Sequence, residues 1–329
     1  MRTVLAVDGG NSKTDVALVG EDGSVLATAR GGAFVPERGA ARAATAVDVV
    51  VAAVRSALGP GPDRVADHVA AYVSGADLPI EEERLHAEFA ARGLGGTVEV
   101  GNDSFALLRA GASAGWGAAV VCGAGTNAVG VGPDGRTARF PALGRLSGDW
   151  GGGAHLGEEV LWHAIRAEDG RGPATALSGG VTEAFGTVRV EEAAIGVHLG
   201  EISYACLDAL VPVLFAVAAG GDAVARELVV RQAEEVTALG TVVLRRLDLL
   251  GTPTEVVLGG GVLTARHPVL MDEIERRYAE RAPVAALVVT DVPPIAGAAL
   301  LGLDRLGATD AAKARLRARF AGGRSAAGG

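Results

Sequence analysis

The sequence is poor in cysteine, in aromatic residues and in long apolar runs. Its 329 residues include only two cysteines, Cys122 and Cys206, too few for a disulfide framework, a four-cysteine cluster or a zinc ribbon. Aromatic residues make up 4% of the chain, whereas 49% is hydrophobic and 49 residues are glycine, so the core must consist of small aliphatic side chains. No apolar run reaches the roughly 18 residues that cross a bilayer. This composition favours close-packed α/β layers.

Clustered positive charge is also scarce. The net charge of −9 argues against a nucleic-acid-binding surface, because phosphate backbones require clustered Lys and Arg. The one basic run, residues 313–319, predicts the end of a helix, and residues 321–329 are expected to form a disordered tail. The N-terminus leads directly into a strand pattern, without the basic segment and cleavage site of a signal peptide. We therefore expect a cytoplasmic protein that binds neither nucleic acid nor membrane.

The chain is long enough for two domains, and its strand and helix patterns predict an α/β fold. A first block has the order βββαβαβ followed by a helix. Its expected elements are a hairpin at 4–19, strands at 25–29, 69–73 and 97–100, and helices at 40–58, 79–92 and from 104. A second block opens at residue 117 with the same order of strand, glycine turn, strand and turn. This repeat predicts two related halves, each with a phosphate-facing hairpin, and a site in the cleft between them.

The rest of the second block is mostly helical in pattern. The expected helices are 153–168, 180–185, 190–196, 201–219 and 223–247, followed by a strand at 256–258, a helix at 267–280, a strand at 286–290 and a closing helix at 294–306. We expect an N-terminal domain of residues 1–110 with 293–320. Residues 111–292 would form a C-terminal domain with a helical insertion.

The segment Asp8-Gly9-Gly10-Asn11-Ser12-Lys13 lies between two apolar runs. Its glycines relax the restriction on φ and let backbone N–H groups approach an anion closely. Asp8 would repel a bound phosphate, so a carboxylate here is best explained by a divalent cation such as Mg²⁺ between the two. An ordinary hairpin with a polar turn is the alternative, because Asp and Gly are common in turns.

A second acidic residue, Asp103, stands where a strand ends and a helix begins. It could cap that helix by accepting backbone N–H bonds. It could instead be a general base that accepts a proton from a hydroxyl as this attacks a γ-phosphoryl group, with Asn102 orienting the hydroxyl. Asp149, which precedes a long helix, is likewise either a cap or a ligand-facing carboxylate. A carboxylate suits the paired hydroxyls of a sugar.

The run Gly123-Ala124-Gly125-Thr126-Asn127-Ala128 matches the dinucleotide fingerprint G-x-G-x-x-A. In that fingerprint the glycines open a helix, whereas residues 128–131 predict a strand, so we reject a dehydrogenase. The chain has no G-x-x-x-x-G-K-[ST] motif, which excludes the usual phosphate loop. Gly259-Gly260-Gly261 follows a buried strand and would let a flat group such as adenine approach the backbone.

Four elements in a fixed order resemble the actin-like ATPase superfamily of sugar kinases, Hsp70 and actin. They are more closely similar to the BadF/BadG/BcrA/BcrD ATPase family, which includes N-acetylglucosamine kinases. The four elements are Asp8–Thr14, Asn102-Asp103, Gly123–Asn127 and Leu258–Val262. Gly148–Gly157, Asp169–Pro173 and the closing helix from Pro294 extend the resemblance over nearly the whole chain. It implies two actin-like, ribonuclease H-like domains with nucleotide and sugar in the cleft between them.

The resemblance also implies a role for each motif. Asp8 would act through Mg²⁺, and Asp103 would be the general base. The residues implied for ATP and its phosphates are Asp8, Gly9, Gly10, Asn11, Ser12, Lys13, Gly123, Ala124, Gly125, Gly260 and Gly261. The residues implied for the sugar are Asn102, Asp103, Thr126, Asn127, Gly144 and Asp149.

Three residues depart from the acetylglucosamine kinase pattern. Leu143 stands where those kinases usually have a Trp against the sugar, Phe34 lies near the place of a sugar-binding Asn, and Ala124 replaces a Thr. These departures concern the substrate more than phosphoryl transfer. We therefore expect a homodimeric ATP-dependent kinase acting on O6 of an amino sugar such as N-acetylglucosamine or glucosamine. The alternative is a nucleotide-gated ATPase or regulatory module that binds ATP without phosphorylating a sugar.

Overall fold

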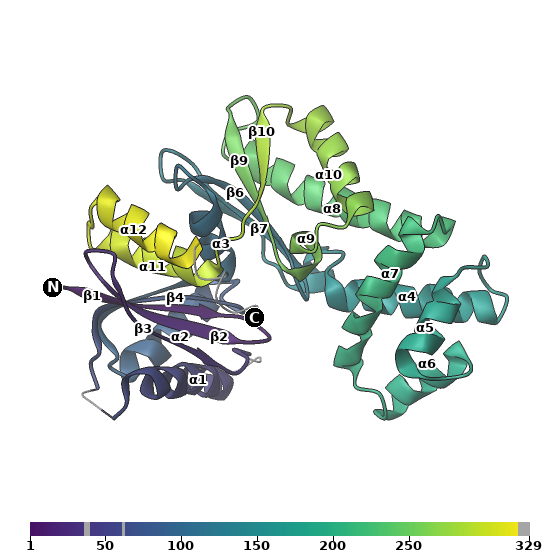
Figure 1. Ribbon diagram of the computed structural model, residues 1–329, viewed down its shortest axis with the longest axis horizontal. Helices are drawn as coiled ribbons and strands as arrows, with labels where there is room; N and C mark the ends of the chain where they lie inside the picture. The colour runs from purple at the N-terminus through teal and green to yellow at the C-terminus, as the bar shows by residue number, and fades with distance from the viewer. Residues whose placement is uncertain (36–39, 61–62, 322–329) are drawn as a thin grey trace. The chain divides into compact units, whose positions relative to one another are not determined.

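Two five-stranded sheets, formed by the residues that the structure describes, organise the fold (Figure 1). The structure is a computed structural model and describes residues 1–35, 40–60 and 63–321. The first sheet has the strand order β3-β2-β1-β4-β5, and the second has the order β10-β9-β6-β7-β8. With the strands numbered from one within each block, and the second sheet read from its β8 edge, both orders run third, second, first, fourth, fifth. This shared order confirms the α/β class and the two related halves that the sequence predicts.

The first sheet begins with a hairpin and continues with parallel strands. β1 (Thr3–Gly9) pairs antiparallel with β2 (Thr14–Gly20), which pairs antiparallel with β3 (Val25–Gly31). On its other side β1 pairs parallel with β4 (Ala66–Val73), and β4 pairs parallel with β5 (Gly95–Asn102). Parallel neighbours need a crossover connection, and helices provide it here.

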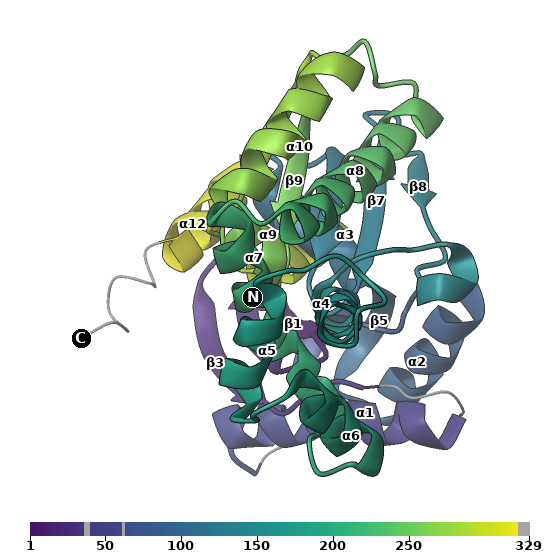
Figure 2. The same ribbon diagram turned by 90° about the vertical axis from the view of Figure 1, so that its right-hand side faces the viewer.

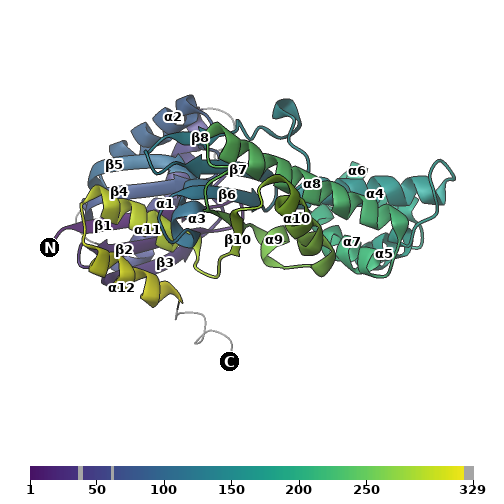
Figure 3. The ribbon, with the colours of Figure 1, turned by 90° about the horizontal axis from the view of Figure 1, so that it is seen from above.

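Helices cover both faces of the first sheet (Figure 1). α1 (Ala40–Leu58) and α2 (Pro79–Ala91) pack on one face. α3 (Asp103–Gly111), α11 (Pro294–Arg305) and α12 (Asp310–Ala321) pack on the other. Figure 3 shows α11 lying over the first sheet, where it contacts β1, β2 and β4. The C-terminal helices α11 and α12 therefore cover the sheet that contains the N-terminal strand β1.

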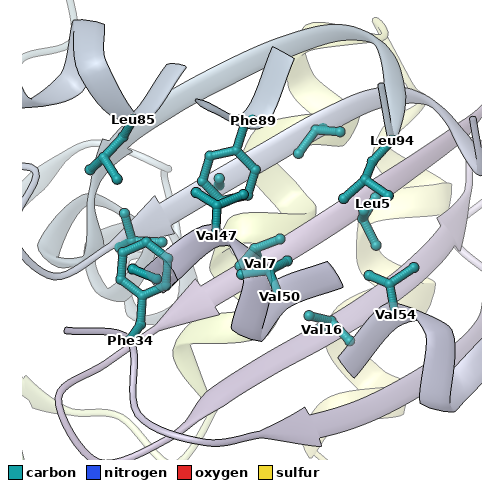
Figure 4. Close-up of a cluster of buried hydrophobic side chains, with 14 of the residues drawn as sticks. Leu5, Val7, Val16, Phe34, Val47, Val50, Val54, Leu85, Phe89 and Leu94 are labelled. Atoms are coloured by element: carbon teal, nitrogen blue, oxygen red, sulfur yellow. The ribbon is translucent and has the colours of Figure 1, made fainter. Parts of the chain in front are cut away.

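Alternate residues of β1 supply two separate cores, because successive side chains of a strand point to opposite faces. Leu5 and Val7 are buried in the cluster shared with α1 and α2 (Figure 4). Val4 and Ala6 are buried in the cluster on the other face, which includes Leu303 of α11. The central strand is thus apolar on both sides, as expected of a strand with parallel neighbours.

Glycine lets α11 approach its neighbours at backbone distance. A Cβ atom at Gly297 would lie 1.8 Å from the carbonyl oxygen of Ala106 in α3. A Cβ atom at Gly302 would lie 2.3 Å from a methyl group of Val4. The layer can therefore be filled by alanine, valine and leucine, which explains how a chain with few aromatic residues builds a dense core.

The second block supplies the second sheet and most of the helices. Its strands are β6 (Gly117–Cys122), β7 (Thr126–Val131), β8 (Thr137–Arg139), β9 (Thr254–Gly259) and β10 (Ala285–Val289). Its helices are the 3₁₀ helix η1 (Gly144–Ser147), α4 (Gly153–Glu168), α5 (Leu177–Phe185), α6 (Val190–Leu199), the 3₁₀ helix η2 (Tyr204–Ala209), α7 (Leu210–Ala219), α8 (Ala223–Arg246), α9 (Gly261–Thr264) and α10 (Pro268–Arg281). α8 and α10 lie side by side (Figure 2).

The chain divides into two compact units. The first contains Met1–Ala119, Val129–Pro141 and the chain from Val288 onward. The second contains Val120–Ala128 and Ala142–Leu287. The domain limits that the sequence suggests, 1–110 with 293–320 and 111–292, stay a prediction. The C-terminal tail expected at residues 321–329 lies, from residue 322 on, outside the described residues.

Some elements differ from the predicted ones. The helix expected at 201–219 is divided into η2 and α7. Pro212 explains this, because proline cannot donate to the carbonyl four residues earlier and is tolerated only in the first turn of a helix. β8 and α9 were not expected, and both are very short. The basic residues 313–319 belong to a separate helix, α12, which begins at Asp310.

In the part of the chain that the structure describes, no single helix is long and apolar enough to cross a membrane. Only the pair Tyr204–Ala219 and Ala223–Arg246, which is bent by 112°, passes on combined length and composition.

Candidate active site

The predicted site residues fall into two sets, one in each compact unit. The first unit contains Asp8 to Lys13 with Asn102 and Asp103. The second unit contains Gly123 to Asn127, Gly144, Asp149, Gly260 and Gly261. Within each unit, residues far apart in the sequence come together.

The turn after β1 is closed by backbone hydrogen bonds. The N–H of Gly10 donates to the carbonyl of Lys13 at 2.8 Å, and the carbonyl of Gly10 accepts from the N–H of Phe34 at 2.9 Å. Neither Gly9 nor Gly10 has a positive φ, so the expectation that they relax the φ restriction is wrong. Gly9 is required for space instead, since a Cβ atom there would lie 2.8 Å from side-chain atoms of Phe34 and Val73. Core packing therefore holds the first part of this turn.

The carboxyl group of Asp8 lies near other acidic groups at the end of β1. Burial, with the nearby charges of Asp103 and Asp15, raises the pKa of Asp8 to about 7. The charges of Lys13 and Arg30 act in the opposite direction but do not balance these effects. A carboxylate in such surroundings is stabilised by an added cation.

The surroundings of Asp8 fit a magnesium ion that is shared with a nucleotide. In the described residues, no group of three or more His, Cys, Asp or Glu side chains could hold a metal. Mg²⁺ needs no such group, because it keeps several waters and binds through one or two carboxylates and the phosphates of a substrate. The residues beyond Gly10 in the turn, Asn11, Ser12 and Lys13, are exposed and thus accessible to phosphate.

Asn102, not Asp103, caps α3. The Asn102 side-chain oxygen accepts the N–H of Ser104 at 3.0 Å, and the Asn102 side-chain amide donates to Asp77 at 2.7 Å. Asp103 is the first residue of the helix proper. The N-cap of α3 is therefore Asn102, although the Asp103 carboxylate also accepts hydrogen bonds from Ser104 in the first turn. The role of Asp103 as a general base stays a prediction. The role of Asn102 toward a sugar hydroxyl stays a prediction.

Asp103 has the properties of a proton acceptor. Burial raises the pKa of its carboxyl group to about 6, although hydrogen bonds from the backbone and hydroxyl of Ser104 oppose this. The residue still keeps an intermediate exposure, so a ligand can reach it. A carboxylate of this pKa is mostly ionised at pH 7 and yet more basic than an ordinary aspartate, as general bases require.

In the second unit, the turn between β6 and β7 is fastened to the start of α4. The N–H of Gly123 donates to the carbonyl of Gly125 at 2.9 Å. The N–H groups of Gly153 and Ala154 donate to the carbonyls of Gly123 and Ala124 at 2.7 and 3.1 Å. The first N–H groups of α4, which have no partner within the helix, are thus satisfied by this turn.

The glycines of three segments touch each other at this turn. A Cβ atom at Gly152 would lie 2.5 Å from Cα of Gly125, and one at Gly260 would lie 2.4 Å from the carbonyl carbon of Cys122. Both residues also have positive φ, +83° and +84°. Packing inside the protein therefore explains the glycine at position 260, because this residue lies against the backbone of β6 at Cys122. Gly261 has no atom within 4 Å of its Cβ position, so its use by a flat ligand stays a prediction.

A recess of about 230 Å³ in the second unit is lined by three of the six residues expected for the sugar and by two of those expected for phosphate. The predicted residues that line it are Ala124, Gly125, Thr126, Gly144 and Asp149. Asn127 is not among its lining residues, and its side-chain oxygen accepts the N–H of Ala128 at 2.7 Å. Arg145, His155 and Glu158 also line the recess, although no sequence motif indicates them. Only their proximity in the sequence to Gly144 and Asp149 could have suggested a place in this site.

Asp149 projects toward this recess from a short loop. Its carboxylate accepts a hydrogen bond from the hydroxyl of Ser147 at 2.7 Å, and its N–H donates to the carbonyl of Gly144 at 3.1 Å. The N-cap of α4 is Gly152, so Asp149 does not cap the helix. These bonds leave most of the carboxylate's lone pairs for a ligand.

Trp150, which directly follows Asp149, packs against side chains of α4 and α8. Its ring is buried, with the Arg231 guanidinium 4.3 Å and the His155 ring 4.9 Å from its centre. The side-chain oxygen of Gln232 accepts the N–H of Gly152 at 3.1 Å. Side chains of α8 therefore hold the segment between Asp149 and α4.

Phe34 and Leu143, the residues at two unusual positions, have different environments. Phe34 is fully buried and stacks on Phe89 with 6.5 Å between ring centres (Figure 4), which makes it a core residue. Leu143 is 37% exposed and directly precedes Gly144 of the recess. Of the three departures, Ala124 lines the recess and Leu143 lies beside it, so these two can influence a ligand.

Comparisons with known proteins agree with this arrangement. The model of the BadF/BadG/BcrA/BcrD ATPase family matches residues 5–302. The chain is 27% identical over 205 residues to the N-acetyl-D-glucosamine kinase of Dictyostelium discoideum. That match covers 62% of this chain and 64% of the enzyme, just under two thirds of its length.

Two further relatives match over more of their length. The N-acetylmuramic acid/N-acetylglucosamine kinase of Clostridium acetobutylicum is 24% identical over 264 residues, which cover 80% of this chain and 86% of that enzyme. The crystal structure of a candidate N-acetylglucosamine kinase from Chromobacterium violaceum superposes with a TM-score of 0.71 and 25% identity. It covers 92% of this chain and 99% of that chain.

Proposed function

Since the chain belongs to the BadF/BadG/BcrA/BcrD ATPase family, we propose that it is an ATP-dependent sugar kinase. The family match confirms the resemblance that the sequence motifs indicate. Both curated relatives named above are kinases of N-acetylated amino sugars, which supports a sugar as the phosphoryl acceptor. The acceptor atom in this proposal is O6 of an amino sugar.

The observation that carries the proposal is the pair of carboxylates at Asp8 and Asp103. Both pKa values are raised, mainly by burial, and the Asp103 charge is felt at Asp8. Two desolvated carboxylates near each other destabilise a ligand-free protein, which supports a role in binding or catalysis. Perturbed acids of this kind are typical of catalytic sites.

Each carboxylate has a different task in the proposed reaction. Asp8 would hold Mg²⁺, which when bound offsets the negative charge of the donor phosphates. The carboxylate of Asp103 accepts the proton of the sugar hydroxyl as its oxygen attacks the γ-phosphorus of ATP. A new oxygen–phosphorus bond forms while the bond to the β-phosphate oxygen breaks, and ADP leaves. The exposed residues of the turn after β1 bind the phosphates of the donor.

The recess in the second unit would bind the acceptor. Hydroxyl groups of a sugar donate to the Asp149 carboxylate, and the Thr126 hydroxyl can both donate and accept. Arg145 and His155 add groups that donate hydrogen bonds to a carbonyl or hydroxyl oxygen of the sugar. Leu143, which directly precedes Gly144 of the recess, would influence which substituent of the sugar fits.

An ADP-release assay with a panel of sugars tests this function. The panel contains glucosamine, N-acetylglucosamine, N-acetylmuramic acid and glucose, and we expect at least one amino sugar to support turnover. Asp103→Asn should reduce kcat by about 10²-fold or more, the usual contribution of a general base. Asp134→Asn, in an exposed turn where Asp134 pairs with Arg136, is the matched control and should change nothing.

Nucleotide binding without turnover on any of these sugars would overturn the kinase proposal. It would favour a nucleotide-gated ATPase or regulatory module of the same fold. Mass spectrometry of the reaction mixture distinguishes the two outcomes, because only a kinase produces a phosphosugar.

A further inference from the structure

A row of charged residues crosses the first sheet beside the turn after β1. Asp8 lies opposite Asp15 in the β1–β2 pairing, and Asp15 lies opposite Arg30 in the β2–β3 pairing. Residues directly opposite each other in neighbouring strands project from the same face of a sheet. Two acidic residues and one arginine therefore stand side by side on one face, next to the exposed end of the hairpin.

Asp15 holds two cations at once. One of its carboxylate oxygens accepts from Nε of Arg30 at 2.6 Å. The other oxygen accepts from Nη2 of Arg30 at 3.2 Å and from Nζ of Lys13 at 2.8 Å. The contacts to Arg30 form a two-point fork, which fixes the guanidinium plane.

The exposure of the three side chains differs in an informative way. The Asp15 side chain is 12% exposed, whereas those of Lys13 and Arg30 are 47% and 65% exposed. Burial alone would raise the pKa of Asp15, but hydrogen bonds from Arg30 and Lys13 lower it below its ordinary value. A buried, ionised carboxylate therefore anchors two cations whose remaining N–H donors face solvent.

Both cations lie beside the turn that faces phosphate. Lys13 is the last residue of that turn, and Arg30 lies opposite Asp15, which lies opposite Asp8 at the end of β1. In the described part of the chain, Asp15 is the only acidic residue that pairs with either of them. Their charge is thus shared with one carboxylate and is available to an anion.

We propose that Arg30 and Lys13 form a two-cation anchor for the terminal phosphates of the nucleotide, with Asp15 as the positioning residue that orients both. The proposal rests on the proposed kinase function and deepens its donor site by adding Arg30 and Asp15. A polyphosphate can accept hydrogen bonds from the N–H donors of Arg30 that Asp15 does not use and from the lysine point charge. Because Asp15 already holds both side chains, less side-chain entropy is lost when the phosphate binds.

The test is calorimetric titration of the full chain with Mg–AMPPNP in the absence of sugar. Asp15→Asn keeps the shape of the side chain and removes its charge, and Arg30→Met removes one cation while Lys13 keeps its partner. We expect each change to weaken binding by about tenfold, in line with the loss of one charge-assisted hydrogen-bond pair. Asp15→Glu should recover most of the affinity, because it restores a carboxylate.

Kinetics separate positioning from a general structural effect. The same variants should raise KM for ATP by about tenfold, while kcat and KM for the sugar stay within about twofold. The matched control is Glu21→Gln, which breaks the 2.8 Å pair with Arg2 at the other end of the same hairpin. It should leave the binding of Mg–AMPPNP unchanged.

Simple electrostatics predicts the opposite sign for Asp15→Asn, which makes the result decisive. Removing an acidic residue leaves Arg30 and Lys13 unneutralised, and their attraction for phosphate should rise unless their orientation matters. Equal or tighter binding by Asp15→Asn overturns the positioning role, and unchanged binding by Arg30→Met overturns the anchor. If Asp15→Asn does not fold, as judged by circular dichroism, Arg30→Met decides the outcome alone.

The two proposals fail separately. Weaker Mg–AMPPNP binding by both variants, without turnover on any sugar, leaves the anchor standing and removes the kinase. Turnover on a sugar with an unchanged KM for ATP in both variants leaves the kinase standing and removes the anchor.

Discussion

Replacing Asp103 by Asn should inactivate the protein and at the same time make its ligand-free form more stable above pH 6. Burial raises the pKa of Asp103 from the ordinary 3.8 to about 6, so the folded state keeps this proton to a higher pH than the unfolded chain does. The stabilisation is complete below pH 3.8 and is lost as the pH rises through about 6. Asn carries no charge and does not suffer this loss.

The size of the effect follows from the two pKa values. A difference of about two pKa units, at about 1.4 kcal/mol each, gives about 3 kcal/mol at pH 8 and about 1 kcal/mol at pH 4.5. Because Asp103 keeps part of its surface exposed, solvent screens its charge and these values are upper limits. The Asp103 charge also raises the pKa of Asp8. Its removal should therefore lower the pKa of Asp8, which adds to the gain in stability at pH 8.

Urea unfolding followed by circular dichroism measures this effect at pH 8 and pH 4.5. Asp103→Asn should be more stable than the natural protein by up to about 3 kcal/mol at pH 8, and this gain should shrink at pH 4.5. Asp134→Asn is again the control, because Arg136 lowers the pKa of Asp134 and its loss should give no gain. A loss of stability at pH 8, or a gain that does not depend on pH, would refute the reasoning.

Three further predictions concern the elements that hold the site. Gly297→Ala should cost about 3 kcal/mol or more in urea unfolding, because its Cβ would lie 1.8 Å from the Ala106 carbonyl oxygen and force two helices apart. Asn102→Ala should cost about 1 kcal/mol or more through the lost N-cap, and Asn102→Asp should not restore this stability, because its carboxylate would face the Asp77 carboxylate that accepts the Asn102 amide. Gly260→Ala should lower the melting temperature, since its Cβ would overlap neighbouring backbone, whereas Gly261→Ala has free space and should leave the melting temperature unchanged.

The features that could be predicted from the sequence are local ones. Apolar runs and glycine turns predicted the strands, and the repeated order of strand, turn and strand predicted the second sheet. The family motifs each lie at the end of a strand, where such patterns are most distinct. The division of residues 201–219 into two helices was not predicted, although Pro212, which is tolerated only in the first turn of a helix, was a local signal for it.

The features that the sequence did not show depend on contacts between distant segments. Asn102 and Asp103 are both good caps by residue type, and only the backbone angles of Asn102, φ −67° and ψ 140°, decide between them. Gly260 suggested a ligand, but its neighbour is Cys122 from a distant strand. Arg30 carried no signal at all, because its link to Asp15 exists only through the register of β2 and β3.

The sign of the pH dependence separates carboxylates kept for structure from those kept for chemistry. Asp304 pairs with Arg109 and Lys313, and these partners lower its pKa although burial opposes them. Its stabilisation is therefore present above the ordinary pKa of 3.8 and is lost only below it, so Asp304→Asn should destabilise the protein to a similar extent at pH 8 and pH 4.5. Asp103→Asn should instead stabilise the protein in the same assay, with a gain that is larger at pH 8 than at pH 4.5. A carboxylate whose removal stabilises the ligand-free protein is retained for a reason other than stability, and for Asp103 we propose proton transfer as that reason.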